Sequence, residues 1–171
     1  LDTVMRIGLD GRNEKEVFRA PEGQGIRGIA LSPDEKVLSV IIGPGALSAA
    51  AGCTLLLVPL DGGSARQVHQ FTNHQGGGVD HAWAPDGRSV LFAVRDENEY
   101  SWDFQRVPVA GGTGPETVYR RNGMTYGMAV HPSGRMIAFT GRVGSSNTSD
   151  AWIMENLKDE LKKLAAEKDG R

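Results

Sequence analysis

The sequence predicts an all-β fold built from a tandem repeat. Three proline-led segments recur about fifty residues apart, SPDEK at 32–36, APDGR at 84–88 and HPSGR at 131–135. Each lies between a run of small residues and a more apolar run, so each predicts the turn of a β-hairpin. The chain of 171 residues also contains 23 glycines and 8 prolines, which is typical of a protein with many tight turns and few helices.

The elements follow in the same order in every repeat. The strands expected before the proline turns are 28–31, 80–83 and 127–130, and those after them are 37–42, 90–94 and 136–140. Glycine-rich turns come next, at 9–11, 60–63 and 109–112, and β-rich segments resume after them at 16–18, 67–69 and 117–119. Four strands per repeat of this length predict the blade of a β-propeller.

The first strand of each repeat has two unlike faces. One face has the pairs Ile29 and Leu31, His81 and Trp83, and Met128 and Val130. The opposite face has only Gly or Ala, except at Asp80. Small side chains are expected where neighbouring sheets approach closely, so these inner strands are predicted to pack on both sides.

The segments SPDEK and APDGR, with the strands around them, resemble the WD40-like repeats of TolB-type β-propellers. Residues 150–156 resemble the third strand of such a blade, so the likeness reaches almost to Leu157. It implies a propeller fold and no single activity, because repeats of this family occur in periplasmic scaffolds, sensors and accessory domains of hydrolases. The compartment stays open, with a periplasmic or otherwise bacterial soluble protein implied by the resemblance.

The strand count predicts two whole blades and two partial ones. The expected pieces are 1–24, 25–77, 78–123 and 124–156, followed by a short amphipathic helix and tail at 157–171 with leucines 157, 161 and 164 on one face. Propellers generally need four to eight blades. The chain is therefore interpreted either as a fragment, natural or engineered, or as half of a six-bladed ring with a second copy. In that dimer, each composite blade has one strand too many.

Composition and motifs narrow the function classes. A net charge of -2 gives no basic patch for nucleic acid, and no run approaches the roughly twenty apolar residues of a membrane span. Cys53 is the single cysteine, so an internal disulfide or a cysteine-based zinc site is impossible. The GxGxxG match at 23–28 is followed by a predicted strand instead of a helix, so it does not predict a phosphate loop. We expect no cofactor.

The candidate binding residues are Arg27, His74 and Tyr126. Arg27, Val79 and Tyr126 occupy equivalent positions six residues before the turn proline, where an incoming loop meets the inner strand. His74 lies in the polar segment 73–78, which leads into another inner strand. The three side chains are predicted to line the mouth of the propeller channel, although exposure alone explains their variation equally well.

A further cluster is acidic. Asp96, Glu97, Glu99 and Asp103 could offer oxygen ligands to calcium. Their spacing does not match an EF-hand, and a solvated hairpin tip is the favoured interpretation. No metal site is expected.

The leading hypothesis is a non-catalytic propeller scaffold that binds protein or peptide and assembles, possibly by homodimerisation. Neither a GxSxG nucleophile motif nor a P-loop lysine motif occurs, so no enzymatic activity is expected. The first alternative is an accessory propeller domain of a larger hydrolase or lyase. The second is a designed or truncated fragment without a ligand.

Overall fold

The computed structural model describes residues 2–44, 52–71, 80–96, 101–123, 125–141 and 150–154, and this part of the chain is entirely β and turn. The prediction of an all-β fold is confirmed. The helix expected at 157–171 lies outside the described residues. Within the described ranges, no helix long and apolar enough to cross a membrane occurs. The chain divides into two compact units, Leu1–Gly77 and Gly78–Arg171.

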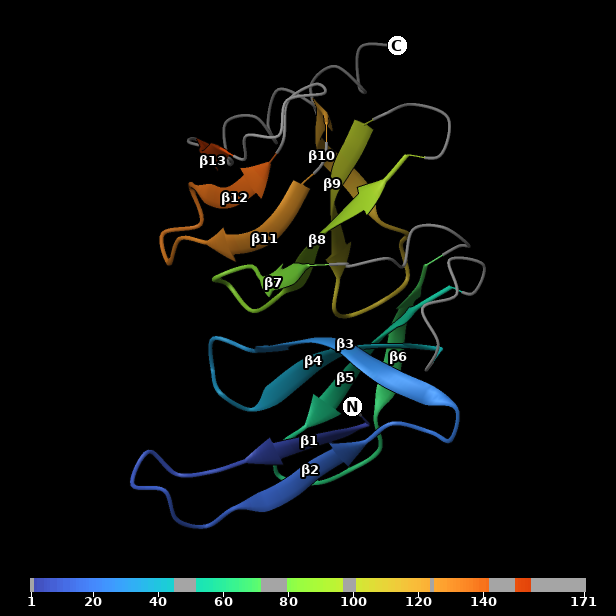
Figure 1. The fold of residues 1–171 in the computed structure, drawn as a ribbon, viewed down its shortest axis with the longest axis vertical. Coiled ribbons are helices and arrows are strands. Elements are labelled where there is room, and N and C mark those ends of the chain that lie inside the picture. The colour runs from blue at the N-terminus through green and yellow to red at the C-terminus, as the bar shows by residue number, and fades with distance from the viewer. Residues whose placement is uncertain are drawn as a thin grey trace. The chain divides into compact units, whose positions relative to one another are not determined.

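The first unit contains a two-stranded sheet and a four-stranded sheet, both antiparallel (Figure 1). The strands, in chain order, are β1 (Thr3–Arg6), β2 (Lys15–Arg19), β3 (Gln24–Leu31), β4 (Val37–Pro44), β5 (Thr54–Pro59) and β6 (Arg66–Gln70). Val4 of β1 and Ala20, directly after β2, are buried against Leu38, Val40 and Val58 of the larger sheet. The β1–β2 hairpin therefore packs on the face formed by β4 and β5.

The second unit has a four-stranded sheet in the order β10-β9-β8-β7 and a three-stranded sheet in the order β11-β12-β13. Its strands are β7 (His81–Trp83), β8 (Ser89–Arg95), β9 (Ser101–Pro108), β10 (Glu116–Asn122), β11 (Thr125–Val130), β12 (Ile137–Gly141) and β13 (Asp150–Met154). Ile137 and Phe139 of β12 are buried against Leu91 of β8 and Phe104 of β9. The rings of Phe104 and Phe139 are 4.8 Å apart, which joins the two sheets through an aromatic core.

The three proline turns have the same hydrogen bonds. The residue two positions after the proline donates its N–H to the residue just before the proline: Glu35 to Ser32, Gly87 to Ala84 and Gly134 to His131, with N···O distances of 2.9, 2.9 and 2.8 Å. The flanking strands pair Leu31 with Leu38, Trp83 with Val90 and Val130 with Ile137. The prediction of one hairpin geometry repeated three times is confirmed. Residues 24–28 of the GxGxxG match form the first part of strand β3.

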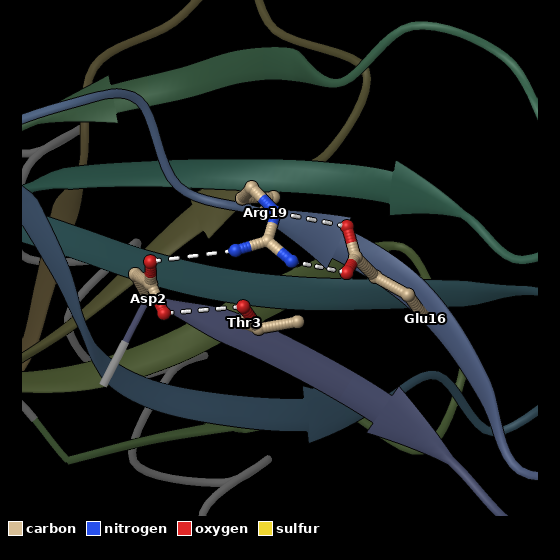
Figure 2. A network of polar contacts seen from close by, with 4 residues as sticks. All are labelled: Asp2, Thr3, Glu16 and Arg19. Atoms are coloured by element: carbon tan, nitrogen blue, oxygen red, sulfur yellow. Dashed lines mark hydrogen bonds and ion pairs between the residues drawn. The ribbon is translucent and has the colours of Figure 1, made fainter.

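A network of polar side chains lies on the surface of the β1–β2 hairpin (Figure 2). The Arg19 guanidinium donates from Nε to Glu16 Oε1 at 3.1 Å and lies 3.5 Å from Asp2 Oδ2 through Nη1. Thr3 Oγ1 donates to the other oxygen of the Asp2 carboxylate, Oδ1, at 3.1 Å. The hydrogen bond to Glu16 is the main cause of the raised pKa of Arg19. Because these groups are solvated, the network orients the hairpin more than it stabilises it.

Candidate functional site

Arg27 lies at an irregularity in β3. The pairing with β4 shifts between Ile26, opposite Ile42, and Gly28, opposite Ile41, so Arg27 is the extra residue of a β-bulge. Its half-buried side chain donates from Nη2 to the carbonyl oxygen of Pro44, the last residue of β4. The guanidinium therefore reaches the end of the neighbouring strand and binds the carbonyl oxygen of its last residue.

A buried thiol lies beside this guanidinium. Cys53 is 2% exposed, and an added Cβ at Gly43 would lie 2.6 Å from its Sγ and 3.7 Å from Arg27 Nε. Only glycine at position 43 leaves room for this arrangement. Burial raises the pKa of the Cys53 thiol, while the nearby Arg27 charge acts in the opposite direction. The thiol is thus protonated at neutral pH and is a packing group.

Tyr126 lies at the equivalent entrance of β11 and is 46% exposed. The pairing with β12 shifts between Tyr126, opposite Thr140, and Met128, opposite Phe139, which makes Gly127 the bulge residue. Gly127 has φ +56°, in the left-handed region that favours glycine. Thr140 Oγ1 donates to the Tyr126 carbonyl oxygen at 2.6 Å. The backbone under the Tyr126 side chain is therefore held by both pairing and a side-chain bond.

Asp80, which precedes β7, has a contact that the sequence did not predict. Its Oδ2 accepts a hydrogen bond from the Gly127 N–H at 2.5 Å, so this carboxylate binds the bulge beside Tyr126. Asp80 stands where the other two repeats have Gly28 and Gly127. The sequence signal for this contact was an aspartate at a repeat position that is glycine in the other two repeats.

The structure describes two of the three predicted binding residues, and these two belong to different compact units. Arg27 belongs to the first compact unit and Tyr126 to the second, and their gathering at one channel mouth stays a prediction. His74 lies outside the described part of the chain, and so does Val79, the repeat equivalent of Arg27 and Tyr126. The local groups that the structure brings together are Arg27 with Pro44 and Cys53, and Tyr126 with Gly127, Asp80 and Thr140.

Two members of the acidic cluster bind an arginine. Arg120 of β10 donates from Nε and Nη2 to the two carboxylate oxygens of Asp103, at 2.7 and 2.9 Å, and its Nη2 is 3.4 Å from Asp96 Oδ2. Glu97 and Glu99 lie outside the described residues. Among the residues that are described, no group of three or more His, Cys, Asp or Glu side chains could hold a metal ion. The Asp103 carboxylate thus links β9 to β10, and Asp96, directly after β8, binds the same guanidinium.

The comparisons with known proteins give a fold and no sequence family. No family model and no curated protein sequence matches the chain. Among solved structures, a prolyl endopeptidase aligns with a TM-score of 0.63 at 16% identity, covering 86% of this chain and 23% of the other. The β-propeller domain of the trilobed protease from Pyrococcus furiosus aligns with a TM-score of 0.58 at 10% identity, covering 81% and 41%.

TolB from Acinetobacter baumannii aligns with a TM-score of 0.49 at 15% identity, covering 90% of this chain and 46% of TolB. The chain thus spans less than half the length of each of these three proteins. The fold assignment rests on the first two. Together with the antiparallel four-stranded sheets and the repeated hairpins, they identify the described part of the chain as blades of a β-propeller, as the resemblance stated above implied.

Proposed function

We propose that this chain is a non-catalytic β-propeller scaffold that binds protein or peptide and assembles. The observation that carries the proposal is the setting of Tyr126. An aromatic side chain that is 46% exposed stands on a backbone fixed by Thr140 and, through Gly127, by Asp80. Rigidly held tyrosines contribute strongly to protein recognition because little entropy is lost when they are buried by a partner.

Arg27 supports the same function in the other unit. It occupies the equivalent position on β3, and its hydrogen bond to Pro44 fixes a positive charge at the strand entrance. Arginine side chains bind the carbonyl and carboxylate groups of partner peptides through planar, directional N–H donors. The proposed ligand is therefore a peptide with aromatic or apolar side chains and acidic or carbonyl acceptors.

The test compares two tyrosines of similar exposure. Random peptides displayed on phage are enriched on the wild-type protein, and the enriched peptides are then titrated against Tyr126→Ala and Tyr119→Ala. Tyr119 is 41% exposed but lies on the outer strand β10. We expect binding to weaken about thirtyfold with Tyr126→Ala and to stay unchanged with Tyr119→Ala. Equal affinity for all three proteins, or no enrichment at all, would contradict the proposal.

A second candidate function is that of an accessory propeller in a larger hydrolase. The supporting observation is that the alignment with a prolyl endopeptidase covers 86% of this chain but only 23% of that protein. An antibody raised against this chain would detect a native polypeptide well above 18.3 kDa in that case. A native polypeptide of this mass would count against it.

A further inference from the structure

One carboxylate of the second unit has no cation partner in the described part of the chain. Asp80 is half-buried directly before β7, and its Oδ2 accepts the N–H of Gly127 at 2.5 Å. Among the described residues, this is the one polar contact of the Asp80 side chain, and no lysine or arginine forms an ion pair with it. A carboxylate has about four acceptor sites. Oδ1 and the negative charge of Asp80 therefore remain for a ligand.

The position of this carboxylate is fixed from two strands. The Asp80 carbonyl oxygen accepts the N–H of Ala93 on β8 at 3.3 Å, and the side chain binds the β-bulge of β11 through Gly127. Both strands belong to the second unit. A ligand that binds Oδ1 therefore meets a carboxylate that is already oriented, which lowers the entropy lost on binding.

The hydrogen bond to Gly127 accounts for an oxygen atom at Asp80 and leaves the charge unexplained. The amide oxygen of an asparagine would accept the same N–H without any charge. The other two repeats have glycine at this position, Gly28 and Gly127, so the repeat itself does not require a side chain here. Because partly buried charges are generally paired, the acid at position 80 points to a cationic ligand.

An exposed aromatic side chain lies at the same peptide bond. Tyr126 is 46% exposed, and the N–H that Asp80 binds belongs to the peptide unit that joins Tyr126 to Gly127. Aromatic rings attract guanidinium and ammonium groups to their faces. A metal ion does not fit the site, since among the residues that the structure describes no three His, Cys, Asp or Glu side chains gather there.

We propose that Asp80 and Tyr126 bind an arginine side chain of the peptide ligand. The guanidinium donates to Asp80 Oδ1 and stacks on the Tyr126 ring. Arginine suits this pair better than lysine, because its planar group forms directional hydrogen bonds and stacks on an aromatic face at the same time. The inference rests on the proposed function, since it specifies one residue of the peptide that Tyr126 binds.

The first test replaces the guanidinium by its neutral isostere. Two capped tripeptides, Ala-Arg-Ala and Ala-citrulline-Ala, are titrated into the wild-type protein, and the Gly127 amide and the Tyr126 ring are followed by NMR. We expect the arginine peptide to bind about tenfold more tightly, because only the guanidinium forms a charge-assisted hydrogen bond with Asp80. Added salt should reduce this difference, since the site is partly exposed.

Asp80→Asn separates the charge of Asp80 from its structural role. The variant keeps an acceptor for the Gly127 N–H, so hydrogen exchange at this amide should stay slow and report a folded bulge. We expect the preference for the arginine peptide to disappear while the affinity for the citrulline peptide stays unchanged. Asp61→Asn, at an exposed turn of the first unit, is the matched control and should keep the preference. A purely structural Asp80 would affect both peptides equally.

The second test uses the peptides enriched on phage for the Tyr126 titration. Replacing their arginine by citrulline should weaken binding to the wild-type protein about tenfold and should not affect binding to Asp80→Asn. Enriched peptides that depend on Tyr126 but contain no arginine would overturn this inference and leave the proposed function intact.

Two results of the tripeptide titration would also overturn it. The first is equal affinity of the wild-type protein for both peptides, which includes binding of neither. The second is a preference for arginine that persists in Asp80→Asn. If no peptide is enriched on phage, the proposed function fails, and the tripeptide titration still decides whether Asp80 and Tyr126 bind a guanidinium.

Discussion

The two compact units each contain one whole four-stranded sheet, but the partial sheet beside it differs. In the first unit, the outer strands β1 and β2 cover β4 and β5, and Ile29 and Leu31 of the inner strand are exposed. In the second unit, the inner strands β11 and β12 contribute Met128 and Val130 to the core. The same repeat position is thus exposed or covered according to which strands of the neighbouring blade are present.

The cores of the two units can be tested separately, because the chain offers a natural probe for each. All three tryptophans, Trp83, Trp102 and Trp152, belong to the second unit, and the single cysteine, Cys53, belongs to the first. Tryptophan fluorescence therefore follows the unfolding of the second unit. The reactivity of the buried thiol follows the unfolding of the first.

The largest effect is expected from Phe104→Ala. Phe104 is 1% exposed and contacts the rings of Phe139 and Tyr119. Removing it should lower the free energy of unfolding seen by fluorescence by about 3–5 kcal/mol, because a cavity remains in the aromatic core. Leu55→Ala, at a fully buried position of β5, is the matched variant and should act mainly on the thiol probe. Equal shifts of both probes in both variants would contradict the division into two units.

The fold was predictable from the sequence because its signals are local. Each proline turn is closed by a bond between residues three apart, and each glycine turn supplies a left-handed residue, such as Gly11 with φ 75° and Gly111 with φ 78°. Turn type fixes hairpin register, and register fixes which side chains share a face. The strand order within each sheet follows from consecutive hairpins.

The site was predictable only in part because its contacts join distant residues. The repeat alignment makes Arg27 and Tyr126 equivalent, six residues before the turn proline, and their role in binding stays a prediction. The bond from Arg27 to Pro44 joins residues 17 apart and that from Gly127 to Asp80 joins residues 47 apart. Neither pairing has a local signal, and the bulges that create both settings change the register by a single residue.

A smaller effect is expected from Asp80→Ala, which removes the hydrogen bond to the Gly127 N–H. A bond to a carboxylate contributes about 1.5–3 kcal/mol when it is protected. Because this one is near the surface, we expect a loss at the lower end of that range, seen by fluorescence. Hydrogen exchange at the Gly127 amide should accelerate as well. Unchanged exchange at this amide would refute the assigned contact, and Asp61→Ala, at an exposed turn of the first unit, is the control.

Acidification should affect the first unit through His69. Burial lowers the pKa of His69 from 6.5, and its ring contacts Phe71 edge-on at 4.8 Å. The unfolded chain therefore binds a proton at a higher pH than the folded chain does, so stability is lost as the pH falls through 6.5, and the loss levels off below the folded pKa. The thiol probe should show this dependence in the wild type and less of it in His69→Gln, with 4,4′-dithiodipyridine as the reagent for acid pH. Identical pH profiles would contradict it.

The smallest expected effect distinguishes the first hairpin turn from the other two. The fourth residue of each turn is left-handed, with φ 60° at Glu35, 67° at Gly87 and 68° at Gly134. A non-glycine residue costs about 1–2 kcal/mol in this conformation, while glycine costs about 0.5–1 kcal/mol in lost unfolded-state freedom. Glu35→Gly should therefore stabilise the first unit by about 0.5–1 kcal/mol, measured with the thiol probe. Gly87→Glu should destabilise the second unit by a similar amount, measured by fluorescence. The same sign for both changes would show that neighbouring charges, and not backbone conformation, decide the stability of these turns.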